Sequence, residues 1–369
     1  MSAAYSGWPD RRLLDLFGIE VPIIQAPMAG SSTTALALAV IEAGGLGSLA
    51  FAMQPPDQVR AGLGDARRAT SRPVGVNFFC HARPEADAVR DAAWRQRLAP
   101  YYSELGLATG TSAAVPADVA FGDEHCHVLA ELTPEVVSFH FGLPGEDLLR
   151  RVKATGAKVV SSATTVAEAV WLEQHGCDAV IAQGCEAGGH RGTFLPGSAA
   201  TQVGTMALVP QVVDAVGVPV IAAGGIADGR GITAALALGA AGVQLGTAYL
   251  FSPEAHVAPV HRRALRAVRD NQTVVTDVLT GRPARAVINR AVRELGPMAE
   301  LLPDFPLPSA ALAPLRSAHE ASGSDDFTPL WAGQAAPLGR PLPAGELTTL
   351  LALESLARLD GRQARLGRT

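Results

Sequence analysis

The chain has 369 residues, more than a single small domain needs and enough for one α/β barrel with an insertion. It carries 30 Lys and Arg against 35 Asp and Glu, a net charge of -5, and no basic block, so nothing indicates a nucleic-acid or membrane-surface partner. We therefore expect a small-molecule partner.

The amino-terminal segment and the apolar runs bear on location. Asp10, Arg11, Arg12 and Asp15 interrupt the stretch in which a signal peptide would need an apolar core. Apolar runs elsewhere are shorter than the ~20 residues that cross a bilayer. We expect a cytoplasmic protein with no membrane partner.

Eight short apolar runs bounded by turn residues predict eight strands. Alanine-rich stretches with helical periodicity lie between several of them, for example Thr33–Ala43 and Thr165–His175. Alternating strands and helices favour a parallel sheet, and eight such units in roughly 250 residues are typical of a TIM barrel. The predicted strands are Pro22–Met28, Leu46–Phe51, Pro73–Phe79, Val136–Phe141, Lys158–Ala163, Ala179–Gln183, Pro219–Gly224 and Gly242–Thr247.

The pattern changes after the eighth predicted strand. Phe251–Thr276 reads as helical and basic, Gly281–Pro297 has loop chemistry, and Leu301–Pro314 is proline-rich. The fold class expected is therefore α/β, a TIM (β/α)8 barrel with a smaller inserted α+β domain. We predict the barrel over residues 1–250, an inserted substrate or lid domain over 251–335, and a C-terminal helix returning to the barrel over 336–369. A second long connection, Cys80–Pro134, is either a lid or simple decoration.

Polar residues follow most of the predicted strands. Because the carboxyl ends of barrel strands meet on one face, these residues should form a ring there, and a polar ring on that face usually meets a ligand, a neighbouring loop or water. For one residue alone a satisfied loop contact is as good an explanation, but the recurrence favours a binding site. The ring comprises Gln25, Met28, Asn77, His140, Ser161, Ser162, Gln183, Gly224, Gly225, Gln244 and Thr247.

Two glycine-containing segments raise the question of phosphate binding. Val220–Ile226, with Val243–Thr247 one helix later, has the composition of the phosphate grip that follows barrel strands seven and eight, although its glycines could simply make a tight turn. Gly45–Ala50 fits a dinucleotide-binding pattern but follows a helix instead of a strand, so packing explains it better.

The Gln183–Gly192 loop contains the main candidate for a catalytic residue. His190 follows a strand end, where a histidine can take a proton from a carbon acid or, when protonated, hold an oxyanion; a simple surface position is the alternative. We expect Arg191 in an outward-facing salt bridge rather than on an anion. Cys185 has no evident base partner, and the cysteine and histidine spacings do not favour a metal site.

Together these segments resemble the class I nitronate monooxygenases, formerly called 2-nitropropane dioxygenases, over nearly the whole chain. The glycine-rich strings around His190 and Gly225 also occur in other FMN-dependent barrels, whereas the strings at Asn77, Tyr101 and His140 point more narrowly to the nitronate enzymes. The segments that carry the resemblance are Gln25–Gly30, Val76–His81, Tyr101–Glu104, Val137–Gly142, Gln183–Gly192, Ala222–Gly231, Gln244–Thr247 and Gly281–Arg285.

The resemblance implies FMN as a non-covalent cofactor and His190 in the family's catalytic position. It implies oxidative denitrification of alkyl nitronates, such as propionate 3-nitronate, with O2 to a carbonyl product and nitrite. His140, Gly333 and Gln334 are the candidate substrate residues. The implied FMN contacts are Ala26, Pro27, Met28, Asn77, Gln183, Gly188, Gly224, Gly225, Gln244, Leu245, Gly246 and Thr247.

Two other functions remain open at this point. One is an FMN-dependent NAD(P)H reductase of a quinone or an enoyl thioester, since such barrels share the glycine-rich strings. The other is a flavin- or phosphate-binding protein without turnover, against which His190 argues. The sequence leaves the oligomeric state and the physiological nitronate open.

Overall fold

The computed structural model describes residues 7–108 and 120–361, and its largest element is a parallel sheet of eight strands. All eight predicted strands are present, and their order is β1-β9-β8-β6-β5-β4-β3-β2. The strands are β1 (Ile23–Gln25), β2 (Ser48–Ala50), β3 (Gly75–Phe79), β4 (Val136–His140), β5 (Lys158–Ala163), β6 (Ala179–Gln183), β8 (Val220–Ala223) and β9 (Gly242–Leu245).

The sheet closes into a barrel at the seam between β1 and β2. Leu46, just before β2, donates its backbone N–H to the Ile23 carbonyl at 3.0 Å and accepts from the Gln25 N–H at 2.9 Å. The buried Gln25 side chain crosses the same seam, because its Oε1 accepts from the Ser48 backbone N–H at 3.0 Å. The predicted TIM barrel is confirmed.

Helices surround the barrel, and several begin at side chains that cap their free backbone N–H groups. Thr33 accepts from the Leu36 N–H before α2, and Asp228 accepts from the Arg230 N–H before α9. No helix in the described ranges is long and apolar enough to cross a membrane. The helices of this layer are α1 (Arg12–Phe17), α2 (Thr34–Glu42), α3 (Pro56–Ala69), α5 (Asp123–Leu132), α6 (Glu146–Ala154), α7 (Val166–Gln174), α8 (Thr205–Ala215), α9 (Gly229–Ala237) and α13 (Ala344–Leu359).

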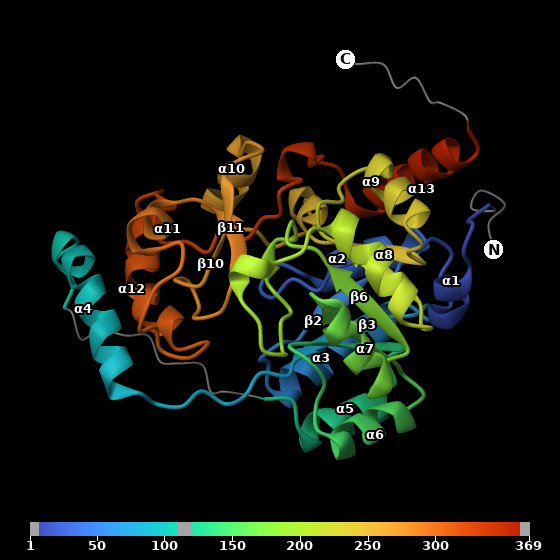
Figure 1. Ribbon diagram of the computed structural model, residues 1–369, viewed down its shortest axis with the longest axis horizontal. Coiled ribbons are helices and arrows are strands. Elements are labelled where there is room, and N and C mark those ends of the chain that lie inside the picture. The colour runs from blue at the N-terminus through green and yellow to red at the C-terminus, as the bar shows by residue number, and fades with distance from the viewer. Residues whose placement is uncertain (1–6, 109–119, 362–369) are drawn as a thin grey trace.

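A second, antiparallel sheet lies beside the barrel in the order β10-β11-β7 (Figure 1). Its short strand β7 is Gly189–His190, so the loop after β6 joins this sheet and pairs His190 with Ala284. The other elements of this region are β10 (Thr273–Thr276), β11 (Ala284–Val287), α10 (Pro259–Ala267), α11 (Arg290–Leu295) and α12 (Pro308–Ala321), and the 3-10 helices of the chain are η2 (Ala199–Thr201), η3 (Thr247–Phe251) and η4 (Ala336–Leu338).

Two sequence expectations for this region are wrong. The helix predicted over Phe251–Thr276 occupies only α10, since Pro259 starts it and the β-branched run Thr273–Thr276 pairs as β10. The loop expected over Gly281–Pro297 contains β11 and α11. Although the segment is rich in residues that favour turns, its Ala284–Val287 stretch forms a strand because it pairs with β10 and β7.

The connection Cys80–Pro134 contains α4 (Ala88–Glu104), which lies at the far end of the molecule beside α12 (Figure 1). Its buried Trp94, Leu98 and Tyr102 share a hydrophobic cluster with Val278, Leu315 and other residues of the 278–327 segment. This helix therefore supports the region next to the barrel. Residues 109–119 of the connection lie outside the described residues.

Candidate active site

A cavity of about 510 Å³ lies at the carboxyl ends of the barrel strands. The second region closes one side of it with Thr280, Phe305 and Trp331. Most of the predicted site residues line this one cavity: Ala26, Pro27, Met28, Asn77, His140, Gln183, Gly188, His190, Gly224, Gly225, Gln244, Gly246, Thr247 and Gly333.

Two predicted site residues do not line the cavity. The side chain of Leu245 is buried in the barrel core with 1% of its surface exposed, and the side chain of Gln334 faces solvent. Gln25, a member of the predicted polar ring, uses both ends of its side-chain amide within the protein. Its Oε1 accepts from Ser48 across the barrel seam, and its Nε2 donates to Ser32 Oγ at 3.0 Å.

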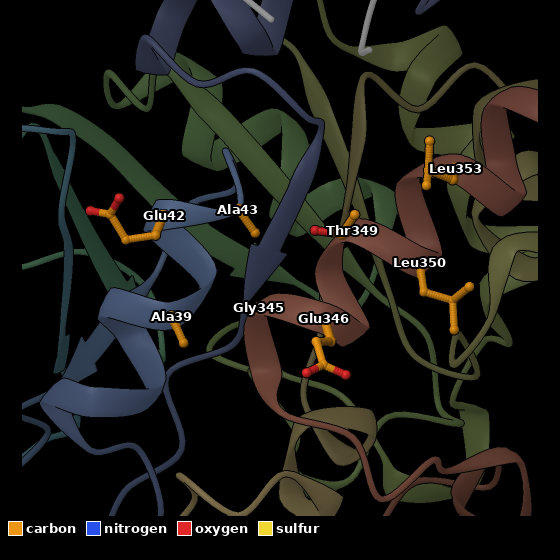
Figure 2. Close-up of a pocket in the computed structure, with 8 residues that line it drawn as sticks. All are labelled: Ala39, Glu42, Ala43, Gly345, Glu346, Thr349, Leu350 and Leu353. Atoms are coloured by element: carbon orange, nitrogen blue, oxygen red, sulfur yellow. The ribbon is translucent and has the colours of Figure 1, made fainter.

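A second hollow of about 510 Å³ lies on the outer surface between α2 and α13 (Figure 2). Its polar side chains are Glu42, Glu346 and Thr349, and the two carboxylates point away from each other. The remaining lining is Ala39, Ala43, Gly345, Leu350 and Leu353. Nothing in this hollow brings reactive groups together, so the strand-end cavity is the candidate site.

The imidazole of His190 sits among aromatic rings at the wall of the cavity. Its ring centroid lies 6.1 Å from that of Phe79, 5.3 Å from that of Phe305 and 5.3 Å from that of Trp331. The centroid of the Phe141 ring lies 6.0 Å from that of His190, and the Arg282 guanidinium lies over the Phe141 ring at 4.0 Å. The histidine is therefore surrounded by apolar surface and held near a positive charge.

This environment sets the protonation state of His190. Burial lowers its pKa to about 3, and the charges of His140, Arg282 and His81 act in the same direction. Burying a charged imidazolium among aromatic rings is costly, and a nearby guanidinium adds repulsion. At neutral pH His190 is therefore an uncharged imidazole, which suits a base and not a cation that holds an oxyanion.

Two side chains hold the backbone carbonyl of His190. Gln183 Nε2 donates to it at 3.0 Å, and His140 Nε2 donates to it at 3.2 Å. Since a carbonyl oxygen only accepts, His140 carries its proton on Nε2, and its Nδ1 accepts from the Ser162 hydroxyl at 3.1 Å. Gln183 also accepts from the Gly192 N–H at 2.8 Å. Both residues therefore position the histidine loop.

The expectation for Arg191 is wrong. Its side chain is 1% exposed, and its guanidinium donates to the carbonyls of Gly184 and Gln183 at 2.6 and 2.7 Å and to Gln202 Oε1. Burial lowers its pKa to about 10. Arg191 thus ties the loop to the end of β6, where the loop's unpaired carbonyls attract a guanidinium more strongly than solvent does.

Another set of cavity residues presents unpaired backbone donors. Among the described residues, none accepts a hydrogen bond from the backbone N–H groups of Gly225, Gly246 or Thr247, which all line the cavity. Gly224 and Gly225 adopt φ angles of 115° and 69°, a region that glycine alone enters readily. Backbone N–H groups without a protein acceptor beside a cavity favour an anion there.

The loops that carry Gly188, Gly333 and Thr247 pack closely against one another beside these donors. A Cβ on Gly188 would stand 2.5 Å from the Gly333 nitrogen, and Gly333 N–H donates to Thr247 Oγ1 at 2.9 Å. Glu186 accepts from the Thr205 N–H at 2.8 Å and so occupies the amino terminus of α8. An anion in this cavity would therefore meet the Gly225 and Gly246–Thr247 donors instead of α8.

Sequence reasoning missed several residues of the site. Thr280 donates or accepts a hydrogen bond at His190 Nε2 over 2.9 Å, and Phe305 covers the same ring. Thr280 directly precedes the Gly281–Arg285 segment, which is the one signal that could have indicated it. Phe305 lies in the proline-rich stretch, where no local pattern marks a cavity wall.

Metal binding has no support in the described chain, where no three His, Cys, Asp or Glu side chains lie close enough to hold an ion. All four cysteines are free thiols. Burial raises the pKa of the Cys80 thiol well above its usual value, so this thiol stays protonated.

Comparison with known proteins agrees with this geometry. A family model described as nitronate monooxygenase matches residues 10–354. A nitronate monooxygenase of Pseudomonas aeruginosa is 44% identical over 346 residues, which cover 93% of this chain and 98% of that protein. A nitronate monooxygenase of Paraburkholderia phytofirmans is 42% identical over 354 residues, which cover 93% and 94%.

Two solved structures show the same architecture. A nitroalkane oxidase from Streptomyces ansochromogenes aligns with a TM-score of 0.85 at 39% identity, covering 95% of this chain and 99% of that chain. FabK from Thermotoga maritima aligns with a TM-score of 0.70 at 30% identity, covering 95% and 97%. Both alignments extend over the barrel and the region beside it.

Proposed function

Because this chain belongs to the nitronate monooxygenase family, as its motifs predicted, we propose that it is an FMN-dependent oxidoreductase that converts alkyl nitronates and O2 to a carbonyl product and nitrite. The observation that carries the proposal is the neutral His190 in an aromatic wall of a cavity that unpaired backbone donors also line. Propionate 3-nitronate is the substrate proposed for the first test.

The residues of the cavity fit FMN. The N–H groups of Gly225, Gly246 and Thr247 would hold its phosphate, since they lack protein acceptors in the described chain. Asn77 uses its Nδ2 on Ser138 at 3.0 Å, which leaves its Oδ1 for the flavin ring. Bound there, FMN supplies the one-electron chemistry that the protein's own side chains lack. The other proposed contacts are Ala26, Pro27, Met28, Gln183, Gly188, Gly224, Gln244 and the backbone of Leu245.

His190 would act when the substrate arrives as a neutral nitroalkane. An uncharged imidazole can accept the proton from the carbon next to the nitro group, which produces the nitronate. The apolar rings of Phe79 and Phe305 exclude water from that step. A substrate that is already a nitronate does not need this proton transfer.

The positive charge beside His190 suits an anionic product of this step. Arg282 lies over Phe141, and its Nη1 is buried with no hydrogen-bond partner among the described residues. A buried guanidinium without a carboxylate attracts negative charge in the adjoining cavity. We further propose that residues 251–335 form an inserted substrate domain, because Thr280, Phe305 and Trp331 come from it.

A nitrite assay tests the proposal. The purified protein with FMN is mixed with propionate 3-nitronate in air, and nitrite is measured; we expect nitrite to form in proportion to enzyme. The control is NADH with a quinone acceptor. Flavin reduction by NADH without nitrite formation from the nitronate would contradict the proposal and support the reductase alternative, and FMN binding without either reaction would support a non-catalytic flavoprotein.

A further inference from the structure

One turn of the second region reaches the reactive side of His190. The Thr280 hydroxyl oxygen lies 2.9 Å from His190 Nε2 and 3.5 Å from the Arg282 carbonyl oxygen. The turn itself is held by Asp277, whose backbone carbonyl accepts from the N–H groups of Thr280 and Gly281 at 3.2 and 2.7 Å. Thr280 is therefore fixed in place before any ligand binds.

The number of available donors and acceptors indicates whether the Thr280 hydroxyl donates to His190 Nε2 or accepts from it. It has one proton to donate and can accept as well. If it donates to His190 Nε2, the Arg282 carbonyl has no donor among the described residues. If it donates to the Arg282 carbonyl and accepts from a protonated Nε2, all three groups are satisfied. The second arrangement gives each of these three groups a hydrogen-bond partner and is favoured.

The other ring nitrogen of His190 is open. Within the described chain Nδ1 has no hydrogen-bond partner, and it is not one of the unpaired polar atoms sealed from solvent. His190 lines the cavity, so this atom is accessible from the cavity. The surrounding phenylalanines, Phe79, Phe141 and Phe305, offer it no polar group.

We propose that Thr280 is a positioning residue that accepts the Nε2–H of His190 and thereby leaves Nδ1 as the base that meets the substrate. This inference rests on the proposed function, because the base is needed for neutral nitroalkanes. The step is a simple transfer: the carbon–hydrogen bond breaks, its proton goes to Nδ1, and its electron pair stays on the substrate as the nitronate.

The surroundings of the imidazole are consistent with this role. Burial, with Arg282, His140 and His81 nearby, lowers the pKa of His190, so its neutral form persists at physiological pH. A neutral imidazole exists as two tautomers, and the group that binds one nitrogen selects between them. Thr280 is the hydrogen-bonding partner that the described structure gives the ring, so the selection depends on it.

Two substitutions separate the hydroxyl from the shape of the side chain. Thr280→Val removes the hydroxyl and keeps the branched shape, while Thr280→Ser keeps the hydroxyl. Isotope-labelled histidine NMR on the FMN-loaded enzyme, with His190→Gln to identify the resonance, reports which ring nitrogen carries the proton. We expect Nε2 protonation in the wild type and in Thr280→Ser, and a mixture of tautomers in Thr280→Val. Nδ1 protonation in the wild type would overturn the proposal.

Kinetics give the second readout. Thr280→Val should lower kcat/KM for neutral nitroethane roughly tenfold to a hundredfold, through misplacement of the base, and lower turnover of the nitronate far less. Equal losses on both substrates, or no loss in Thr280→Val, would contradict the positioning role. If the wild type turned over neither substrate, the proposed function would fail, whereas the NMR result would still decide the tautomer.

Discussion

His190 is fixed at both its backbone and its ring, and this double restraint defines the site at the scale of single residues. Gln183 and His140 hold its carbonyl, and Thr280 holds Nε2. Catalytic groups work best when their orientation is set before substrate binds. The part of the cavity proposed for FMN presents backbone donors instead, so the two parts can be tested by different kinds of substitution.

His190→Asn should retain FMN and lose turnover of neutral nitroalkanes by a factor of roughly 10² to 10⁴, the usual contribution of a general base. Turnover of preformed nitronates should change far less, because no proton is removed from them. The measurement is kcat/KM for nitroethane and for its nitronate in the same buffer. Equal losses on the two substrates would rule out the base assignment.

Gly246→Leu should weaken FMN binding without straining the backbone. Gly246 has a φ of -106°, which any residue adopts, and an added Cβ would lie 3.5 Å from the Ala26 Cβ and 3.8 Å from the Met28 sulfur at the cavity wall. The larger side chain would fill space proposed for the cofactor. FMN content and affinity, measured by flavin fluorescence, check this, with Gly246→Ala as the milder control. Unchanged affinity in the leucine variant would contradict the placement of FMN.

At the scale of elements, α4 and α12 form a support for the cavity wall. Trp94 Nε1 donates to the Pro308 carbonyl at 3.3 Å, and Tyr102 donates to the Ala311 carbonyl at 2.6 Å. The residues just before α12, including Phe305, line the cavity. A helix from the Cys80–Pro134 connection therefore positions a wall of the site from a distance.

Leu98→Ala should test this support. Leu98 is 0% exposed in the cluster shared with α12, so its truncation should cost about 2–5 kcal/mol of stability. Hydrogen exchange should accelerate in α12 more than in the barrel strands. The KM for nitroethane should rise, because Phe305 is no longer held in the cavity wall by the packing of α4 against α12. Val89→Ala on the same helix, at a side chain 71% exposed, is the matched control and should change stability by less than about 0.5 kcal/mol. Uniform acceleration throughout the barrel would argue against a local support.

For the whole molecule, three buried histidines predict loss of stability in acid. Burial lowers the pKa of His190 to about 3 and those of His140 and His261 to about 4, against an ordinary value of 6.5. Below pH 6.5 the unfolded chain therefore binds protons that the folded chain does not. Stability should be complete above pH 6.5 and fall progressively toward pH 4, by an amount on the order of a few kcal/mol at pH 5.

Urea unfolding at a fixed FMN concentration across this pH range measures the effect. His140→Gln should flatten the dependence, since one of the three groups no longer titrates. A stability that stayed constant between pH 7 and pH 5 would contradict the prediction, because it would show that these histidines take up protons in the folded protein as they do in the unfolded chain.

The barrel could be predicted from the sequence because its signals are local. Each strand is a short apolar run between turn residues, and runs such as Ala179–Gln183 agree with the structure to the residue. The same holds for the glycine-rich turns at Gly188 and Gly224–Gly225, which require glycine whatever lies elsewhere in the chain. The prediction failed at Phe251–Thr276 because the Thr273–Thr276 run pairs with Ala284–Val287, a segment that the sequence analysis expected to be loop.

The sequence by itself determined the barrel, the ring of polar strand ends and the position of His190, since these follow from periodicity and turn chemistry along adjacent residues. Only the tertiary structure decided what surrounds that histidine. Thr280 lies 90 residues further along the chain, and Phe305 also reaches the histidine through long-range packing. Such contacts leave no local pattern, because they arise when separate segments are brought together around a shared core.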